Sequence, residues 1–169
     1  MKKVLYITYD GILEPLGYSQ ILSYLIHLSK HNYIKIISVE KKKDLLNVDH
    51  FNKINNILKE NNIKWKFFNY ADNKFGKTIL VSKLLSYIFF NLMNKKINIV
   101  HARSYITGLL VYILKFFFNF HFIFDIRGFW IDERIDWGLW RKKSIKYIFF
   151  RFIEKKIYNK SNTIVTLTN

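Results

Sequence analysis

The sequence predicts an α/β protein whose core is a Rossmann-like, doubly wound parallel sheet of about six strands with helices on both faces. Short apolar segments rich in β-branched and aromatic residues alternate, along the whole chain, with longer segments whose apolar residues recur at helical spacing. Parallel strands joined through helices have right-handed crossovers, so this alternation builds an open sheet covered on both sides. A closed barrel would need two more strand–helix units.

Six segments are expected to be strands, because each is a compact apolar run bounded by polar or turn residues. They cover residues 3–9, 34–39, 63–68, 97–101, 120–125 and 163–167. The first run ends at Asp10 and Gly11, as a buried parallel strand does when it meets a turn.

Helices are expected between these strands. Their apolar stripes are Ile21, Leu25 and Leu28; Phe51, Ile54 and Leu58; and Val81, Leu84, Ile88 and Leu92; two further helices cover residues 105–116 and 137–158. The first is expected to start at Ser19, which could cap it, and residues 71–77 are expected to be a polar loop. Residues 105–126 are apolar enough to resemble a membrane span, but polar residues interrupt them, so we expect a buried helix followed by a buried strand.

Length, net charge and cysteine content indicate how many domains the chain has, which partners suit it and where it is located. A length of 169 residues without a linker-like segment predicts one domain over residues 1–169. The net charge of +16 points to an anionic partner, for which nucleic acid, anionic lipid and nucleotide-sugar phosphates all qualify. No known nucleic-acid-binding spacing is present, so no nucleic acid is expected. The absence of cysteine excludes disulfides, and the start of the chain lacks a secretory leader, which favours a cytoplasmic location.

Ligands of open parallel sheets bind beyond the carboxyl ends of the strands, so function is sought in the loops there. The first such loop contains Asp10, Gly11, Gly17, Ser19 and Gln20. Its glycines permit close backbone approach, and the following helix offers its positive N-terminus to an anion or a sugar. Neither a dinucleotide fingerprint nor a P-loop is present. The alternative is a turn that only reverses the chain.

The second loop, residues 101–105, contains His101, Arg103 and Ser104. Histidine can donate and accept hydrogen bonds near neutral pH, and arginine offers a fork of donors for phosphate or carboxylate. The alternative is that His101 is a structural hydrogen-bonding residue at a strand end.

The third loop, residues 125–138, contains Asp125, Arg127, Gly128, Trp130 and Glu133. An indole face can stack on a sugar ring while carboxylates and a guanidinium bind hydroxyl groups, so this loop is a candidate binding loop. The alternative is a solvated loop with internal ion pairs. The acids in this loop, Asp125, Asp132, Glu133 and Asp136, are a weak metal signal, and no metal site is expected.

At these three loops the chain resembles the family-four glycosyltransferases, specifically the "glycosyltransferase 4-like" N-terminal domain of GT-B enzymes. Residues 4–11 and 15–20 are similar to the first strand and acceptor loop of bacterial members, residues 101–105 to the end of their fourth strand, and residues 125–130 and 132–134 to the loop after the fifth. Residues 162–168 resemble the strand that precedes the crossing to the second domain.

The resemblance implies transfer of a sugar from a nucleotide-diphosphate sugar to a glycan or lipid-linked acceptor, as in surface polysaccharide synthesis, in a cleft between two domains and without a cofactor. The N-terminal domain would position the acceptor, while the C-terminal domain would bind the nucleotide and carry a paired-glutamate motif. That motif is absent from this sequence. We therefore expect the chain to be inactive by itself, because the charge on the departing diphosphate would not be stabilised.

The resemblance also implies roles for individual residues. His101 and Arg127 would be catalytic, and Arg127 stands where many relatives have a histidine that contacts the transferred sugar. The implied substrate-binding residues are Asp10, Gly11, Gly17, Ser19, Gln20, Arg103, Ser104, Asp125, Gly128, Trp130 and Glu133. Gly11 and Gly17 would shape the acceptor loop beside the donor phosphates.

Residues 141–160 contain eight Lys or Arg and one Glu, with Ile145, Ile148, Phe149, Phe152 and Ile153 expected on the other side of the helix. Such a helix could lie on the anionic inner face of the cytoplasmic membrane, or could pack on the core with a solvated basic face. Two further functional alternatives are a non-catalytic subunit or remnant that pairs with a separate donor domain, and a basic domain that binds nucleic acid or an anionic membrane.

Overall fold

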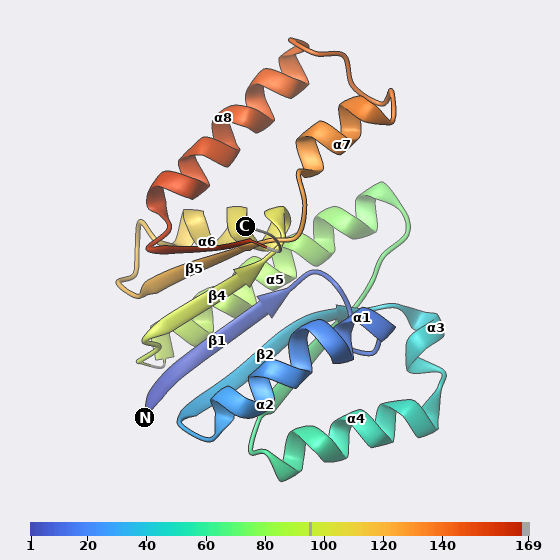
Figure 1. Ribbon diagram of the computed structural model, residues 1–169, viewed down its shortest axis with the longest axis vertical. Helices are drawn as coiled ribbons and strands as arrows, with labels where there is room; N and C mark the ends of the chain where they lie inside the picture. Colours follow the sequence, from blue (N-terminus) through green and yellow to red (C-terminus); the bar gives the residue numbers. More distant parts are fainter. Residues whose placement is uncertain (95, 167–169) are drawn as a thin grey trace.

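The computed structural model describes residues 1–94 and 96–166 and has the predicted α/β fold (Figure 1). Its single sheet has the strand order β3-β2-β1-β4-β5-β6, and all five pairings are parallel. The strands are β1 (Lys2–Thr8), β2 (Asn32–Glu40), β3 (Lys64–Asn69), β4 (Ile99–Arg103), β5 (His121–Ile126) and β6 (Thr163–Thr166). The strand order changes direction between β1 and β4, and open α/β sheets bind ligands at such a point.

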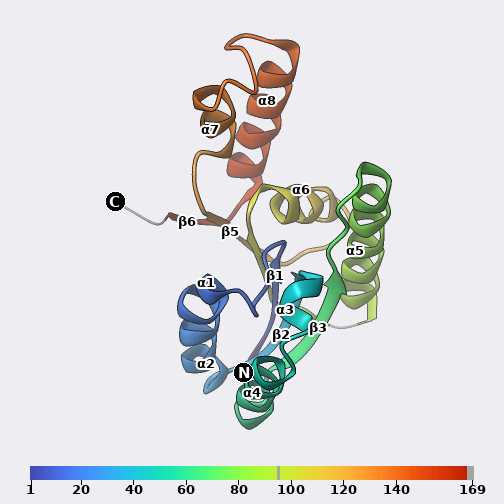
Figure 2. The ribbon, with the colours of Figure 1, turned by 90° about the vertical axis from the view of Figure 1, so that its right-hand side faces the viewer.

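Helices cover both faces of the sheet, as predicted. They are α1 (Pro15–Gly17), the π-helix η1 (Tyr18–Leu22), α2 (Ser23–Ser29), α3 (Lys42–Leu45), α4 (Val48–Glu60), α5 (Lys74–Asn94), α6 (Tyr105–Leu114), α7 (Trp130–Asp136) and α8 (Ile145–Lys160). Figure 2 shows α1 and α2 on one side of the sheet and α5 and α6 on the other. The α7–α8 arm, residues 130–160, projects away from the sheet in both views (Figures 1 and 2).

Two apolar clusters hold these layers together, because successive strand residues point to opposite faces. Tyr6 belongs to the cluster under α2 and α4, whereas its neighbours Leu5 and Ile7 belong to the cluster under α5 and α6. All three side chains are fully buried. Because both faces of a central strand are covered by helices, its sequence must be apolar at nearly every position.

The prediction of one long helix over residues 137–158 is wrong at its N-terminal end. The chain instead forms α7, a connection of residues 137–144, and then α8. Gly138 and Lys143 in this connection have φ angles of +68° and +66°, which a right-handed helix cannot contain. The Ser144 side chain then accepts a hydrogen bond from the Tyr147 N–H and caps α8.

The first helical segment also differs from the expectation. It begins at Pro15, before Ser19, and the Ser19 hydroxyl donates to the Pro15 carbonyl over 3.4 Å, so Ser19 is not a cap. Leu28, expected in the apolar stripe, is 44% exposed. Helix α5 starts at Lys74, inside the expected loop of residues 71–77.

Strand β4 runs two residues further than predicted, because Ala102 and Arg103 pair with both β1 and β5. His101 and Arg103 are therefore strand residues and not loop residues. Residues 105–126 form α6 and then β5, as expected, and no helix within the described part of the chain is long and apolar enough to cross a membrane. Leu167 of the predicted sixth strand lies outside the described residues.

Candidate functional site

Polar side chains from three neighbouring strands meet near the carboxyl ends of β1, β4 and β5. In the sheet register Arg103 is the partner of Thr8 on one side and of Asp125 on the other, and His101 is the partner of Tyr6. Side chains of register partners lie on the same face of a sheet. The strand pairing alone therefore places His101, Arg103 and Asp125 together on the face that α2 covers.

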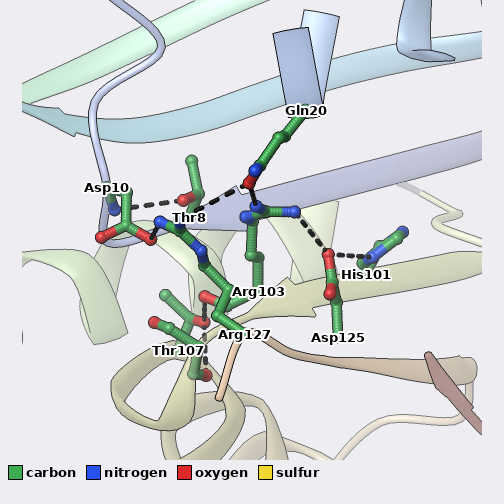
Figure 3. A network of polar contacts seen from close by, with 9 residues as sticks. Thr8, Asp10, Gln20, His101, Arg103, Thr107, Asp125 and Arg127 are labelled. Atoms are coloured by element: carbon green, nitrogen blue, oxygen red, sulfur yellow. Dashed lines mark hydrogen bonds and ion pairs between the residues drawn. The ribbon is translucent and has the colours of Figure 1, made fainter. Parts of the chain in front are cut away.

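Arg103 is the centre of this cluster (Figure 3). Its Nη1 donates to Asp125 Oδ2 over 3.0 Å and its Nη2 donates to Gln20 Oε1 over 2.6 Å. Arg103 is 3% exposed and Asp125 is 4% exposed. A buried charge persists only when it is paired and hydrogen-bonded, and both conditions are met here.

His101 lies behind this pair and does not face open solvent. Its Nε2 is 3.5 Å from Asp125 Oδ2, and the residue is 9% exposed. The imidazole ring is enclosed by Tyr6, whose ring centroid is 4.6 Å away, and by Tyr24 at 6.1 Å. His101 therefore contacts the polar cluster through Asp125.

Burial and charge act in opposite directions on Asp125. Burial favours the neutral acid, but the neighbouring His101 imidazole and Arg103 guanidinium favour the carboxylate and together lower the pKa of Asp125. Burial raises the pKa of the Tyr6 hydroxyl to about 12. Asp125 is thus held as an anion and Tyr6 as a neutral phenol at physiological pH.

Arg127 forms the accessible part of the same network. Its Nη1 donates to Asp10 Oδ2 over 3.0 Å, and its Nη2 lies 3.5 Å from the Gln20 oxygen that Arg103 also binds. The side chains of Arg127 and Asp10 are 29% and 36% exposed. Gln20 sits in the π-helix η1, a kind of segment frequently found at functional sites. Its amide oxygen links the buried arginine to the one that a ligand can reach.

The network opens onto a pocket of about 420 Å³ between the rim of the sheet and helices α6, α7 and α8. Its polar lining includes Asp10, Ser104, Arg127, Gly128, Glu133 and Glu154. The remaining wall is largely aromatic and aliphatic and includes Tyr105, Ile106, Leu109, Trp130, Ile131, Phe150, Ile153 and Ile157. A pocket with a few converging polar groups and an apolar wall is the usual form of a small-molecule site.

Ser104 joins the cluster to the pocket in a strained conformation. Its φ of 81° and ψ of 163° belong to a region that is essentially limited to glycine. Its N–H donates to the Asp125 carbonyl over 3.1 Å, while its buried hydroxyl oxygen has no partner among the described residues. Strain of this kind concentrates at functional sites, where the surrounding structure enforces it.

The predicted glycines have packing roles. A Cβ on Gly17 would lie 2.5 Å from the Gly11 carbonyl oxygen, and one on Gly11 would lie 2.5 Å from Glu40 Oε2. A Cβ on Gly128 would lie 2.6 Å from Glu133 Oε1. Gly11 and Gly17 therefore let the first loop fold tightly on itself and on β2, whereas Gly128 lets Glu133 approach the rim.

Two buried acids near the site were missed by sequence reasoning. Glu40 accepts hydrogen bonds from the Ile12 and Leu13 N–H groups, over 2.9 and 3.2 Å, and burial raises its pKa. Glu154, at the pocket wall, accepts from the Tyr105 hydroxyl over 2.7 Å. In the sequence, Glu40 is an acid at the end of an apolar strand segment, and Glu154 is an acid in a basic helical segment. These two patterns could have indicated them.

The structure thus brings most of the predicted residues to one rim. Asp10, Gln20, His101, Arg103, Asp125 and Arg127 share the polar network, and Ser104, Gly128, Trp130 and Glu133 line the adjoining pocket. Ser19 is exposed and does not line the pocket. Trp130 and Glu133 lie on α7, not in an irregular loop. No three metal-ligating side chains form a possible metal site within residues 1–94 and 96–166.

Comparisons with protein-family models and with curated proteins gave no match to this chain. The resemblance to family-four glycosyltransferases therefore rests on the residues quoted from the sequence and stays a prediction.

Proposed function

We propose that this domain is the acceptor-binding half of a family-four-like glycosyltransferase, which transfers a sugar from a nucleotide-diphosphate sugar to a glycan or lipid-linked acceptor in surface polysaccharide synthesis. One observation carries the proposal. The accessible Arg127–Asp10 pair opens onto a 420 Å³ pocket and is tied through Gln20 to the buried Arg103–Asp125 pair. These charged groups are fixed by hydrogen bonds and lie near the point where the strand order changes direction. Such groups are suited to orienting a polar ligand.

The chemistry of the pocket suits a sugar-bearing acceptor. Asp10 and Glu133 can accept hydrogen bonds from sugar hydroxyls, and Arg127 can donate to them. Trp130 and Phe150 give the wall an apolar surface for the C–H face of a sugar ring or for an alkyl group. An acceptor with both a sugar and an apolar portion would suit both the polar and the apolar lining of the pocket.

In the transfer itself, a bond forms between an acceptor oxygen and the anomeric carbon of the donor, and the bond from that carbon to the diphosphate breaks. The hydroxyl proton passes to an oxygen of the departing diphosphate, which leaves with its remaining negative charge. In this proposal Arg127 would stabilise that charge from the acceptor side. His101 is assigned a positioning role, because it touches Asp125 and would reach a substrate only through it.

Acceptor binding can be tested on this chain by saturation-transfer NMR with a panel of methyl and hexyl glycosides. We expect saturation of ring protons of at least one sugar, and a loss of most of that signal in Arg127→Ala and Asp10→Asn. Arg141→Ala, which removes an exposed arginine from the connection between α7 and α8, is the matched control and should keep it. Failure of every glycoside to bind, or equal loss in the control, would contradict the proposal.

The donor domain that completes this site would belong either to the same polypeptide or to a separate one. Sequencing the DNA downstream distinguishes these forms. A continuing reading frame with a second Rossmann-like pattern and paired glutamates would place both halves in one enzyme. A stop codon would favour a subunit that pairs with a separate donor domain.

A further inference from the structure

The outer face of α8 is apolar and exposed. Ile145, Ile148, Phe149 and Phe152 are spaced as neighbours on one side of a helix, and they are 88, 58, 55 and 59% exposed. We call these four residues the α8 face. Side chains that hold the helix in place lie elsewhere on it: Glu154 and Ile157 are buried. Four of the five apolar residues expected on one side of this helix therefore face away from the core.

Further exposed apolar residues continue from this face into the connection that precedes α8. Trp137 is 66% exposed and Leu139 is 57% exposed. This connection lies at the outer end of the α7–α8 arm, away from the sheet (Figure 1). Monomeric proteins rarely leave so many large apolar side chains exposed on one element, and such patches mark interaction surfaces.

The exposed charges of residues 141–160 all have one sign. Lys142, Lys146, Lys155 and Lys156 are all exposed, and Lys156 Nζ lies over the Phe152 ring, 5.1 Å from its centroid. The one acid between residues 145 and 160, Glu154, is buried and bound to Tyr105 and Arg151. The surface that solvent meets on α8 is therefore apolar in the middle and basic around it.

We propose that the α8 face and the adjoining connection dock this protein onto an anionic phospholipid bilayer. The apolar side chains would enter the boundary between headgroups and acyl chains, and the lysines would bind lipid phosphates. Trp137 is a residue type that favours this boundary. A second copy of the chain is disfavoured as the occupant, because a two-fold interface would bring two lysine-rich surfaces together on chains of net charge +16.

The docking surface is independent of the proposed sugar transfer, since none of these exposed residues lines the pocket. It can be tested by co-sedimentation of the chain with vesicles of phosphatidylglycerol and phosphatidylcholine, compared with vesicles of phosphatidylcholine alone. We expect binding to the anionic vesicles, weakened by salt, and little binding to the neutral ones.

Two sets of variants locate the contact. Ile148→Ser with Phe152→Ser should weaken vesicle binding on the order of 100-fold, as removal of two inserted apolar side chains predicts. Leu46→Ser with Phe75→Ser removes apolar residues that are even more exposed, at 71% and 78%, from another part of the surface and should leave binding unchanged. Lys142→Gln, Lys146→Gln and Lys155→Gln together should weaken binding on the order of 100-fold. Lys42→Gln, Lys43→Gln and Lys59→Gln together are the charge-matched control.

The proposal is overturned by equal sedimentation with neutral and anionic vesicles, or by equal losses in the variants and their controls. It is also overturned if the Ile148→Ser, Phe152→Ser pair dissociates a dimer in sedimentation velocity without lipid, because the α8 face would then bind a second copy. Circular dichroism should show unchanged folding in every variant, since all the substituted side chains are exposed.

Discussion

Arg103 and Asp125 face each other across neighbouring strands β4 and β5, with Nη1 3.0 Å from Oδ2, and both side chains are almost completely buried. This ion pair connects the sheet to the candidate site, because Arg103 also holds Gln20, whose amide oxygen lies within 3.5 Å of Arg127. Removal of the Asp125 charge would leave the Arg103 guanidinium buried without this ion-pair partner.

Asp125→Asn tests the importance of this pair for stability. The substitution keeps the shape of the side chain but leaves the Arg103 charge unpaired, so we expect the free energy of unfolding to fall by about 3 kcal/mol. Asp136→Asn, at an exposed position, should change it by less than about 0.5 kcal/mol. Urea denaturation followed by circular dichroism measures both values. Similar small effects in the two variants would show that the buried pair adds nothing.

The lowered pKa of Asp125 predicts how stability depends on pH. Because the carboxylate is favoured in the folded state, its contribution is fully present above the unfolded-state pKa, near the usual value of 3.8, and is lost as pH falls through the lower folded-state pKa. The advantage of the wild type over Asp125→Asn should therefore shrink below about pH 4. Unfolding measured over a pH series checks this, and a constant difference down to pH 2 would contradict it.

The close packing of the first loop predicts that glycine substitutions there will lower the free energy of unfolding by different amounts. Gly17→Ala would force a methyl group against the backbone of Gly11 and Ile12, so we expect it to cost about 3 kcal/mol or more. Gly11→Ala meets the side chain of Glu40, which can move, and should cost less, about 1 to 2 kcal/mol.

Gly138→Ala is the control for these glycine variants. No atom lies within 4 Å of its new methyl group, so only the left-handed backbone opposes it, at about 1 kcal/mol. Thermal denaturation of the three variants gives the order directly. A Gly17 variant as stable as the Gly138 variant would show that the loop is not packed as described.

The strained backbone of Ser104 predicts a stabilising substitution. Glycine adopts a φ of 81° and ψ of 163° without the penalty of a side chain, so Ser104→Gly should relieve more strain than it adds in unfolded-state entropy, for a net gain of about 1 kcal/mol. Ser82→Gly, in the middle of α5 at an exposed position, should instead lose about 0.5 kcal/mol. Destabilisation of both variants by equal amounts would rule out strain at Ser104.

Local patterns in the sequence were enough to predict the layers of the fold. The six apolar runs became the six parallel strands with small shifts at their ends, because a strand buried on both faces needs a nearly continuous apolar segment. The N-terminal part of the helix expected over residues 137–158 failed for the opposite reason. Its apolar residues have helical spacing, but the left-handed backbone at Gly138 and Lys143 ends the helical path, and spacing alone does not reveal that.

The sequence by itself determined which residue types lie at the carboxyl ends of β1, β4 and β5, and the parallel order of those strands placed them at one edge of the sheet. Only the tertiary structure decided which of them a ligand can reach. Burial depends on what packs above each side chain: η1 and α2 enclose His101 and Arg103, whereas Arg127 and Asp10 remain accessible beside the pocket. The same dependence left the apolar side of α8 exposed, because the side chains that anchor that helix to α6 and α7 lie on another of its faces.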